Sequence, residues 1–265
     1  MKLFKALMAA AALALVTGAA QAARTDVTIA MQLEPPSLDP TTGGAAAAIR
    51  SVTYGNIFEG LTKIDSAGAV QPLLAKSWDI SDDGLTYTFH LQDGVKFQDG
   101  TPLTAADVKY SLDTARGEKS VNAQKQLFAK IASVDAVDDH TVKVTLSGPQ
   151  GDFLYNMGWG DAVIVSEKTA ASNGTNPVGT GPYKLGEWVK GDHVTLTANP
   201  DYWGAKPAIQ TATMKFISEP TAAVAAILAG DVDYFGGFPA PEALTQIKAD
   251  PRLQIIVGAT NGETV

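Results

Sequence analysis

The side chains that most often carry out chemistry are few in this sequence and widely spaced. The three histidines, His90, His140 and His193, share no spacing typical of a metal site. There is no cysteine, no G-x-S-x-G or H-E-x-x-H motif and no G-x-x-x-x-G-K-[ST] phosphate loop. Adjacent acidic residues fall in turns, where they have a structural use. We therefore predict no catalytic residue, no metal and no cofactor, and we predict that the protein is not an enzyme.

Glycine-rich loops next to predicted elements offer backbone groups for binding instead. Thr42, Gly43 and Gly44 precede an alanine-rich helix that we predict over residues 45–58. Glycines before a helix leave N–H groups approachable, and these can hold a carboxylate or carbonyl oxygen of a ligand; a plain flexible connection is the alternative. The segment 235–238 (FGGF) follows a strand predicted at residues 231–234, at the carboxyl end of a sheet, where open α/β sheets bind ligands.

One aromatic residue is a further candidate for ligand contact from its setting, and a second is implied only by a loose resemblance to relatives. Trp159 lies between Gly158 and Gly160, a setting that often leaves an aromatic ring at a cleft, and packing in the core is the alternative. Phe128 lies on a short helix predicted over residues 123–131, and it is at least as well explained as a core aromatic of an amphipathic helix.

The elements around these candidates follow from periodicity and turn signals. Residues 86–91 alternate as a half-buried strand, the turn at 93–94 is predicted to bring Val95 and Phe97 back against it, and Thr104 with Asp107 predicts a helix start. Gly117 and Gly230 are predicted helix ends. The helix predicted at 220–229 is apolar nearly all round, so we expect it to be buried. The other predicted strands are 26–31, 61–64, 134–137, 141–146, 194–197, 211–217 and 253–257, and the other short helices are 153–157 and 241–248.

The first 22 residues have the features of a cleaved signal peptide. Lys2 and Lys5 precede an apolar run over residues 7–16, and the segment 20–22 (AQA) fits a small-x-small cleavage site before Ala23. The apolar run is too short to span a bilayer, and the absence of cysteine leaves no site for a lipid anchor. We therefore predict a periplasmic protein of a Gram-negative-type cell, without direct membrane insertion or disulfides.

The charge balance limits the possible partners. The sequence has 20 basic and 28 acidic residues, a net charge of −8, and loss of Lys2 and Lys5 with the signal peptide leaves 18 − 28 = −10. A strongly negative chain does not favour nucleic acid or an anionic membrane surface as a partner. A cationic ligand is one interpretation of this charge, and a solubilising surface is the other.

Several long motifs resemble one known family. Residues 72–112 (PLLAKSWDISDDGLTYTFHLQDGVKFQDGTPLTAADVKYSL) closely resemble the signature of the family 5 extracellular solute-binding proteins of ABC importers, of the dipeptide-, oligopeptide- and nickel-binding type. Gln92 departs from the pattern, which usually has Arg. The segments 37–40 (SLDP), 176–183 (NPVGTGPY), 199–204 (NPDYWG) and 231–234 (DVDY) resemble further motifs of the same proteins.

This resemblance implies a fold and a set of binding residues. The fold is α/β with mixed sheets, a periplasmic-binding-protein-like type II lobe with an inserted α+β subdomain. We predict an incomplete lobe I at residues 23–65 and 178–258, an inserted subdomain at 66–177, a hinge crossing that starts at 259–265, and a second lobe that is missing from this amino-terminal half. The substrate-binding residues implied or predicted from their setting are Thr42, Gly43, Gly44, Ala45, Phe128, Trp159, Phe235, Gly236 and Gly237.

The resemblance also implies the function. It is that of a periplasmic substrate-binding component of an ABC importer, which captures peptides or a related small solute, delivers it to membrane permease subunits and is monomeric at full length. An exported hydrolase and a cargo-binding sensory or chaperone partner are the alternatives. We expect weak or no ligand binding by this half alone and an exposed apolar surface on it. We also expect Gly43–Gly44 and Phe235–Gly237 to border a common hollow.

Overall fold

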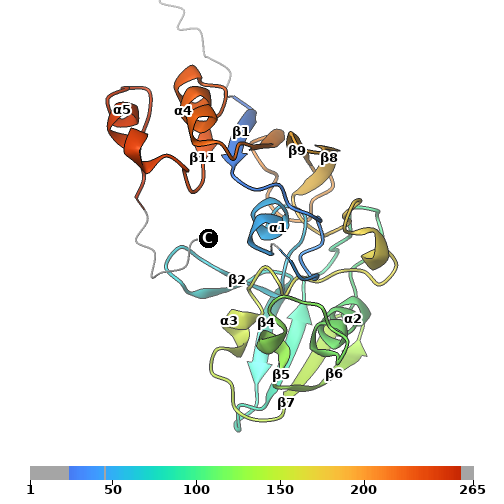
Figure 1. Ribbon diagram of the computed structural model, residues 1–265. Coiled ribbons are helices and arrows are strands. Elements are labelled where there is room, and N and C mark those ends of the chain that lie inside the picture. Colours follow the sequence, from blue (N-terminus) through green and yellow to red (C-terminus); the bar gives the residue numbers. More distant parts are fainter. Residues whose placement is uncertain (1–23, 45, 258–265) are drawn as a thin grey trace, which may run out of the picture.

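The computed structural model describes residues 24–44 and 46–257, so the predicted signal peptide, Ala45 and the predicted hinge segment lie outside the described residues. Two main sheets organise this part of the chain, with α1 between them and α4 and α5 at one side (Figure 1). The first sheet is formed by strands from both ends of the described chain, and the second by strands from its middle.

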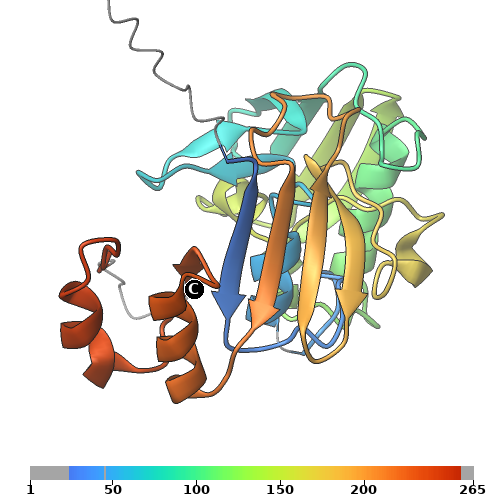
Figure 2. The same ribbon diagram turned by 90° about the horizontal axis from the view of Figure 1, so that it is seen from above.

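The first sheet is a mixed five-stranded sheet in the order β11-β1-β10-β9-β8. Strand β1, next to the edge strand β11, pairs in parallel with β10 and β11, and β9 pairs antiparallel with β10 and β8. Alternation places the buried Ala212, Met214, Val194 and Leu196 on one face, and α1 covers this face (Figure 2). The bounds are β1 (Asp26–Met31), α1 (Ala46–Thr53), β8 (Tyr183–Val189), β9 (His193–Ala198), β10 (Thr211–Phe216) and β11 (Tyr234–Phe235).

The second sheet is antiparallel, in the order β4-β5-β7-β6, and α2 packs against it. The predicted alternation of Tyr87, Phe89 and Leu91 is confirmed, since all three are buried. The predicted start of α2 is also confirmed, because the Asp107 carboxylate accepts the backbone N–H of Thr104 at 2.9 Å. The bounds are β4 (Ala75–Ile80), β5 (Thr86–Leu91), α2 (Ala105–Arg116), β6 (Ile131–Asp138) and β7 (Thr141–Leu146).

The predicted return of Val95 and Phe97 against the strand at 86–91 is wrong. β5 is flanked by β4 on one side and β7 on the other, so neither of its edges is free for the chain after Gly94. Val95 and Phe97 are buried in the core without a strand, and the chain there makes only the isolated bridge Lys96–Pro102 among the described residues. The turn signal at residues 93–94 is real, but β5 pairs with β4, which precedes it, and with β7, which follows much later in the chain.

Other predicted elements also differ from the structure. The helix predicted at 45–58 is shorter, and the one predicted at 123–131 is a 3-10 turn followed directly by β6. The segment 253–257 is not a strand, and Ile256 is 76% exposed because no described strand pairs with it. α4 is not buried all round, since Ala223 is the residue of this helix that is buried. The remaining elements are β2 (Thr62–Ile64), β3 (Val70–Pro72), η1 (Lys125–Phe128), α3 (Phe153–Asn156), η2 (Ala170–Ser172), α4 (Pro220–Ala229), η3 (Pro241–Ala243) and α5 (Leu244–Lys248).

A compact junction joins the two main sheets where the chain returns through residues 176–183. A methyl group on Gly179 would lie 1.9 Å from the Ile57 carbonyl oxygen, and one on Gly181 would lie 2.3 Å from that of Asn56, so only glycine fits at either position. The N–H of Gly181 donates to the Ile57 carbonyl at 2.9 Å. The motif 176–183 therefore packs its backbone directly against the segment that follows α1.

The division into lobe I and an inserted subdomain stays a prediction. The five strands of the first sheet all fall within the ranges predicted for lobe I, and the four strands of the second sheet within the predicted insertion. The hairpin of β2 and β3 crosses the predicted boundary. Within residues 24–44 and 46–257, no helix combines the length and hydropathy that a membrane crossing needs.

Candidate ligand-binding site

The segment 37–42 forms a firmly bonded turn beyond the carboxyl end of β1. The Asp39 carboxylate accepts the Thr41 N–H at 2.9 Å and the Thr41 hydroxyl at 2.6 Å, and the Thr42 hydroxyl donates to the Asp39 carbonyl at 2.8 Å. Leu38 is fully buried, and its N–H donates to the Gly174 carbonyl at 2.9 Å. These contacts fix the backbone before it reaches the two glycines.

The glycines of this loop are required for two different reasons. A methyl group on Gly43 would lie 2.8 Å from the carbonyl oxygen of Val121, so the close approach of the two chains excludes a side chain. Gly44 has open space around it but a φ of +83°, which L-residues rarely adopt. Both glycines are exposed, and Ala45, the next predicted contact, lies outside the described residues.

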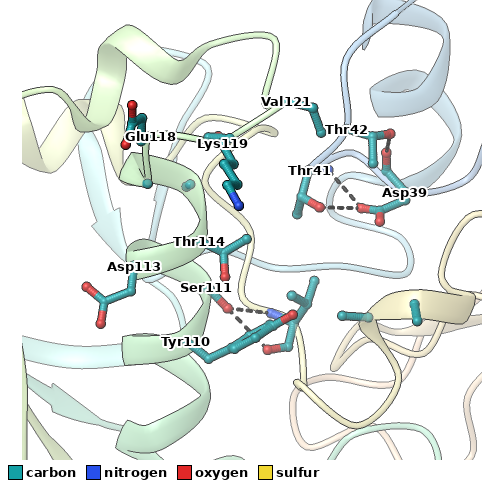
Figure 3. Close-up of a pocket in the computed structure, with 16 residues that line it drawn as sticks. Asp39, Thr41, Thr42, Tyr110, Ser111, Asp113, Thr114, Glu118, Lys119 and Val121 are labelled. Carbon is teal, nitrogen blue, oxygen red and sulfur yellow. Dashed lines mark hydrogen bonds between the residues drawn. The ribbon is translucent and has the colours of Figure 1, made fainter.

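A cavity of about 620 Å³ opens between this loop and the C-terminal end of α2 (Figure 3). Thr42 is one of its lining residues, and Lys119 points into the space between α2 and Thr41. We call this space the loop cavity. It is lined by Asp39, Thr41, Thr42, Tyr110, Ser111, Asp113, Thr114, Ala115, Gly117, Glu118, Lys119, Ser120, Val121, Val165, Ala170 and Ala171.

Trp159 lies on a short turn that packs against α1 and the residues just after it. The Tyr54 hydroxyl donates to the Gly158 carbonyl. A methyl group on Gly160 would lie 2.5 Å from Cδ of Arg50, so the arginine stem lies directly over this glycine. Trp159 itself is partly exposed, with its ring centroid 6.5 Å from that of Tyr155 in an edge-on arrangement. The ring is thus held in place without being enclosed.

The residue after this turn, Asp161, forms an ion pair with α1. Nη1 of Arg50 lies 2.5 Å from Oδ2 of Asp161, whose side chain is fully buried, whereas the Arg50 side chain is 23% exposed. Burial raises the pKa of Asp161, and the positive charge of Arg50 opposes this effect. Nδ2 of Asn122 donates to the Asp161 carbonyl oxygen at 2.9 Å. The ion pair is therefore joined through Asn122 to Val121, and so to Gly43.

The predicted contacts at 235–237 border a different space. Gly236 lines a second cavity of about 430 Å³ on the apolar face of the first sheet, beside Ile29 and Met214. Phe235 packs edge-on against Phe238, with ring centroids 5.3 Å apart, and the Gly237 carbonyl accepts the side-chain amide of Gln32. We call this space the sheet cavity; its other lining residues are Val27, Ala30, Met31, Ser51, Asn56, Tyr183, Ile209, Ala212 and Tyr234.

The expectation of one common hollow is therefore not met within the described residues. Thr42 lines the loop cavity and Gly236 lines the sheet cavity, and no residue lines both. The segment 37–42 comes after β1, and Phe235 is the last residue of the parallel strand β11, so both segments lie toward the same edge of the sheet. The loop cavity, however, opens toward α2, whereas the sheet cavity lies between β1 and α1. They form two separate surfaces at this edge.

Phe128 does not belong to either surface. Its side chain is fully buried in the core beneath the second sheet, and its 3-10 turn packs against α2. The structure thus favours the alternative that the sequence left open, a core aromatic, because a ring with no exposed surface cannot contact a ligand without rearrangement.

Sequence reasoning missed three charged residues near the predicted loop, Arg50, Lys119 and Asp161. Arg50 and Asp161 each stand alone in an apolar stretch, AAAIRSV and MGWGDAVIV. Isolated charges in apolar surroundings are rarely buried unless they are paired, so this pattern was the available signal. Lys119 has no such signal, because it lies in a polar loop next to Glu118.

The arrangement suits binding rather than covalent chemistry. The loop cavity is bordered by hydroxyl groups, one lysine and the acidic residues Asp39, Asp113 and Glu118, and the sheet cavity is mostly apolar. His90 and His193 each bond to acidic side chains on the protein surface. In the part of the chain that the structure describes, no three His, Asp or Glu side chains gather as metal ligands would.

Comparison with known proteins identifies the relatives of this chain. Residues 69–265 match the family described as bacterial extracellular solute-binding proteins, family 5 Middle. The glutathione-binding protein GsiB of Escherichia coli (strain K12) is 32% identical over 251 residues, which cover 92% of this chain and 48% of GsiB. The chain thus spans about half the length of the curated relatives that it matches.

Solved structures give the same result for the fold. The periplasmic binding protein DppA from Helicobacter pylori, in complex with the peptide STSA, has a TM-score of 0.76 and 30% identity; the match covers 85% of this chain and 49% of DppA. The periplasmic binding protein AgaA from A. tumefaciens R10, in complex with agropinic acid, has a TM-score of 0.77 and 30% identity, covering 85% of this chain and 46% of AgaA. The α/β fold with mixed sheets and the resemblance to about half of a periplasmic binding protein are confirmed.

Proposed function

Because the chain belongs to the bacterial extracellular solute-binding proteins of family 5, we propose that it forms the amino-terminal part of the solute receptor of an ABC importer. The family match over residues 69–265 is the observation that carries this proposal. The family consists of solute-binding proteins and not of enzymes. The receptor would deliver its cargo to permease subunits in the membrane.

The proposed lobe I, residues 23–65 and 178–258, would form one side of a ligand cleft, with residues 66–177 as an insertion. The hinge crossing proposed to begin at residues 259–265 would lead to a second lobe. Closure of two lobes around a solute is a population shift driven by contacts that both lobes make with it. One lobe alone would bury only part of the solute, so we propose weak binding by this half and strong binding by the full-length protein, as a monomer.

The proposed contacts from this half are the exposed loop and the partly exposed indole. Thr42, Gly43 and Gly44, with Ala45 after them, would present backbone N–H groups and a hydroxyl to polar groups of the ligand. Trp159 would cover an apolar part of it. We propose a second contact at Phe235, Gly236 and Gly237. It is supported by the position of Gly236 in the lining of the sheet cavity.

The ligand class is proposed from the chemistry that the relatives share. GsiB binds glutathione, DppA was solved with a tetrapeptide and AgaA with agropinic acid. All three are small, polar, flexible molecules that carry carboxylate groups. We propose a ligand of this kind, a short peptide or a peptide-like acid, captured in the periplasm after removal of the predicted signal peptide. N-terminal sequencing of the exported protein should give Ala23 as its first residue.

A thermal-shift screen of the full-length protein tests the proposed function. The ligands are glutathione, the peptide STSA and agropinic acid, with maltose as an unrelated solute. A true ligand at about 100 times its Kd should raise the Tm by about 2–3 °C, since binding to the folded state alone stabilises it. Trp159→Ala should weaken binding about tenfold, whereas Val137→Ala, a truncation of an exposed side chain on β6, should not. If a broad screen of peptides and acids yields no stabilising ligand, the proposed function is wrong.

A further inference from the structure

Arg50 and Asp161 form an ion pair that is incomplete on both sides. The Asp161 side chain is fully buried and its Oδ2 accepts from Arg50, but Oδ1 has no hydrogen-bond partner among the described residues. Arg50 uses only Nη1, so within the same residues its Nε and Nη2 are left without acceptors. Arginine and carboxylate groups usually pair through two parallel bonds, which satisfies both. Here one arm of the guanidinium is unused.

A purely structural role explains this pair poorly. The turn at 158–161 is already bound to α1 by the Tyr54–Gly158 hydrogen bond, and to the 120s segment by Asn122. A buried ion pair costs desolvation energy, and it is a weak source of stability unless its polar atoms are all satisfied. A buried carboxylate that is only half satisfied, next to an arginine that is partly exposed, is the arrangement expected when a third group completes the contact.

The pair also lies beside the proposed ligand loop. Asn122 bonds to the Asp161 backbone, and its neighbour Val121 approaches Gly43 so closely that no side chain fits between them. The arginine stem runs over Gly160, next to the partly exposed Trp159. Arg50 lies on α1 five positions after Ala45, on the helix that the loop leads into. Arg50 thus lies on the side of α1 that faces the 158–161 turn, which carries the proposed contact Trp159.

We infer that Arg50 binds a carboxylate group of the ligand, and that Asp161 is the positioning residue that holds its guanidinium in place. The inference rests on the proposed function and adds the group that this half would recognise. A guanidinium fits a carboxylate through a planar pair of N–H donors, which an ammonium cannot offer. The overall charge of the chain is −8, so a fixed cation at this position also separates acidic ligands from cationic ones.

The test compares variants of the full-length protein with the same ligands, by calorimetry. The probes are glutathione, STSA, the C-terminal amide of STSA and agropinic acid. Arg50→Lys keeps the charge next to Asp161 but loses the planar fork, and the double variant Arg50→Gln/Asp161→Asn removes both charges without leaving one buried alone. Arg252→Gln, which removes an exposed arginine that pairs with Asp250 and lines neither cavity, is the matched control.

We expect the double variant to bind the acid that the wild type prefers about 10- to 100-fold more weakly, and Arg50→Lys about tenfold more weakly, with the control unchanged. If STSA is that ligand, its amide should bind the wild type as weakly as STSA binds the double variant. Ligand binding that persists in both Arg50 variants would overturn this inference and leave the proposed function standing. If no probe or screened acid binds the wild type at all, the proposed function fails first, and this inference fails with it.

Discussion

Two buried carboxylates, Glu59 and Asp161, differ in how completely their surroundings satisfy them. Glu59 is 2% exposed and accepts three hydrogen bonds, from the Tyr202 hydroxyl at 2.7 Å, the Thr180 hydroxyl at 2.8 Å and the Trp203 indole at 3.0 Å. No cation pairs with it among the described residues. Asp161 has an arginine, but one of its oxygens has no partner. The satisfied carboxylate holds the fold together, and the unsatisfied one marks the proposed site.

The donors around Glu59 explain why two separate motifs occur together in one chain. Thr180 comes from the motif at 176–183, and Tyr202 and Trp203 come from the motif at 199–204. Glu59 itself follows the segment that Gly179 and Gly181 contact. The Glu59 cluster, defined as Glu59, Thr180, Tyr202 and Trp203, therefore joins the predicted lobe I to the point where the chain returns from the insertion. Its members specify a junction rather than a binding site.

Glu59→Ala should have the largest effect, because it leaves three donors without an acceptor, the buried Thr180 hydroxyl and the partly buried Tyr202 and Trp203 side chains. Each unsatisfied buried donor costs about 1–3 kcal/mol, so we expect the free energy of unfolding to fall by about 4 kcal/mol or more. Urea unfolding of the full-length protein, followed by tryptophan fluorescence, measures this loss. Glu59→Gln is the matched control. The glutamine oxygen can still accept from Thr180 and Trp203, and its amide can donate to the Tyr202 hydroxyl. The free energy of unfolding at neutral pH should therefore fall much less than in Glu59→Ala. Equal losses in both variants would contradict the role given to the cluster.

Gly179→Ala should come next, through the backbone of the same junction. Its methyl group would lie 1.9 Å from the Ile57 carbonyl oxygen, which cannot move without displacing the segment before Glu59. We expect a loss of about 3 kcal/mol by urea unfolding. Gly191→Ala is the control, since it has a φ of +78° but nothing within 4 Å, and conformational strain alone should cost about 1 kcal/mol. Similar losses at both positions would show that close packing at the junction is not what requires glycine at 179.

The contrast between these regions also shows what the sequence can predict. The Glu59 cluster lies within motifs whose turns and aromatic residues are visible in the chain, and the predicted corner at 199–204 was identified, though not its bonds to Glu59. The strand at 86–91 and the start of α2 followed from local patterns, because alternation and capping depend on nearby residues. The strand that pairs with residues 86–91 could not be predicted in the same way, because the turn before this strand and the turn after it give equally good hairpin signals.

The charged part of the candidate site was also beyond local reasoning. Arg50 and Asp161 are 111 residues apart, and only the fold brings them together. The apolar helix 220–229 shows the opposite error, because its composition predicts burial but cannot say how many neighbours it has. Periodicity thus identifies which residues prefer the core, whereas contacts between distant segments decide which residues form a site.

Breaking the Arg50–Asp161 pair should cost less than breaking the Glu59 cluster. Arg50→Met leaves a buried carboxylate unpaired, but Arg50 is 23% exposed and water can reach this region, so we expect a loss of about 2 kcal/mol in urea unfolding. The double variant Arg50→Met/Asp161→Leu should regain most of it, because two apolar side chains replace the pair. A double variant that is as unstable as Arg50→Met alone would mean that the pair itself, and not the isolated charge, determines stability.

The smallest effect should be a difference in pH dependence. Burial raises the pKa of Glu59 above its ordinary value, and its three hydrogen bonds only partly oppose this. The folded state therefore binds this proton more tightly than the unfolded state. The stability that proton binding at Glu59 adds is fully present below the unfolded pKa of about 4.3, and it is lost as the pH rises through the folded pKa. Glu59→Gln cannot ionise, so its free energy of unfolding does not fall in this way.

The stability of Glu59→Gln relative to wild type, measured by urea unfolding between pH 4 and 8, should increase with pH. Asp161→Asn should show the same trend more weakly, because Arg50 stabilises the charged form of Asp161. A flat difference for Glu59→Gln would mean that the cluster holds its charge without cost, and the contrast between the two carboxylates would then depend on hydrogen bonds alone.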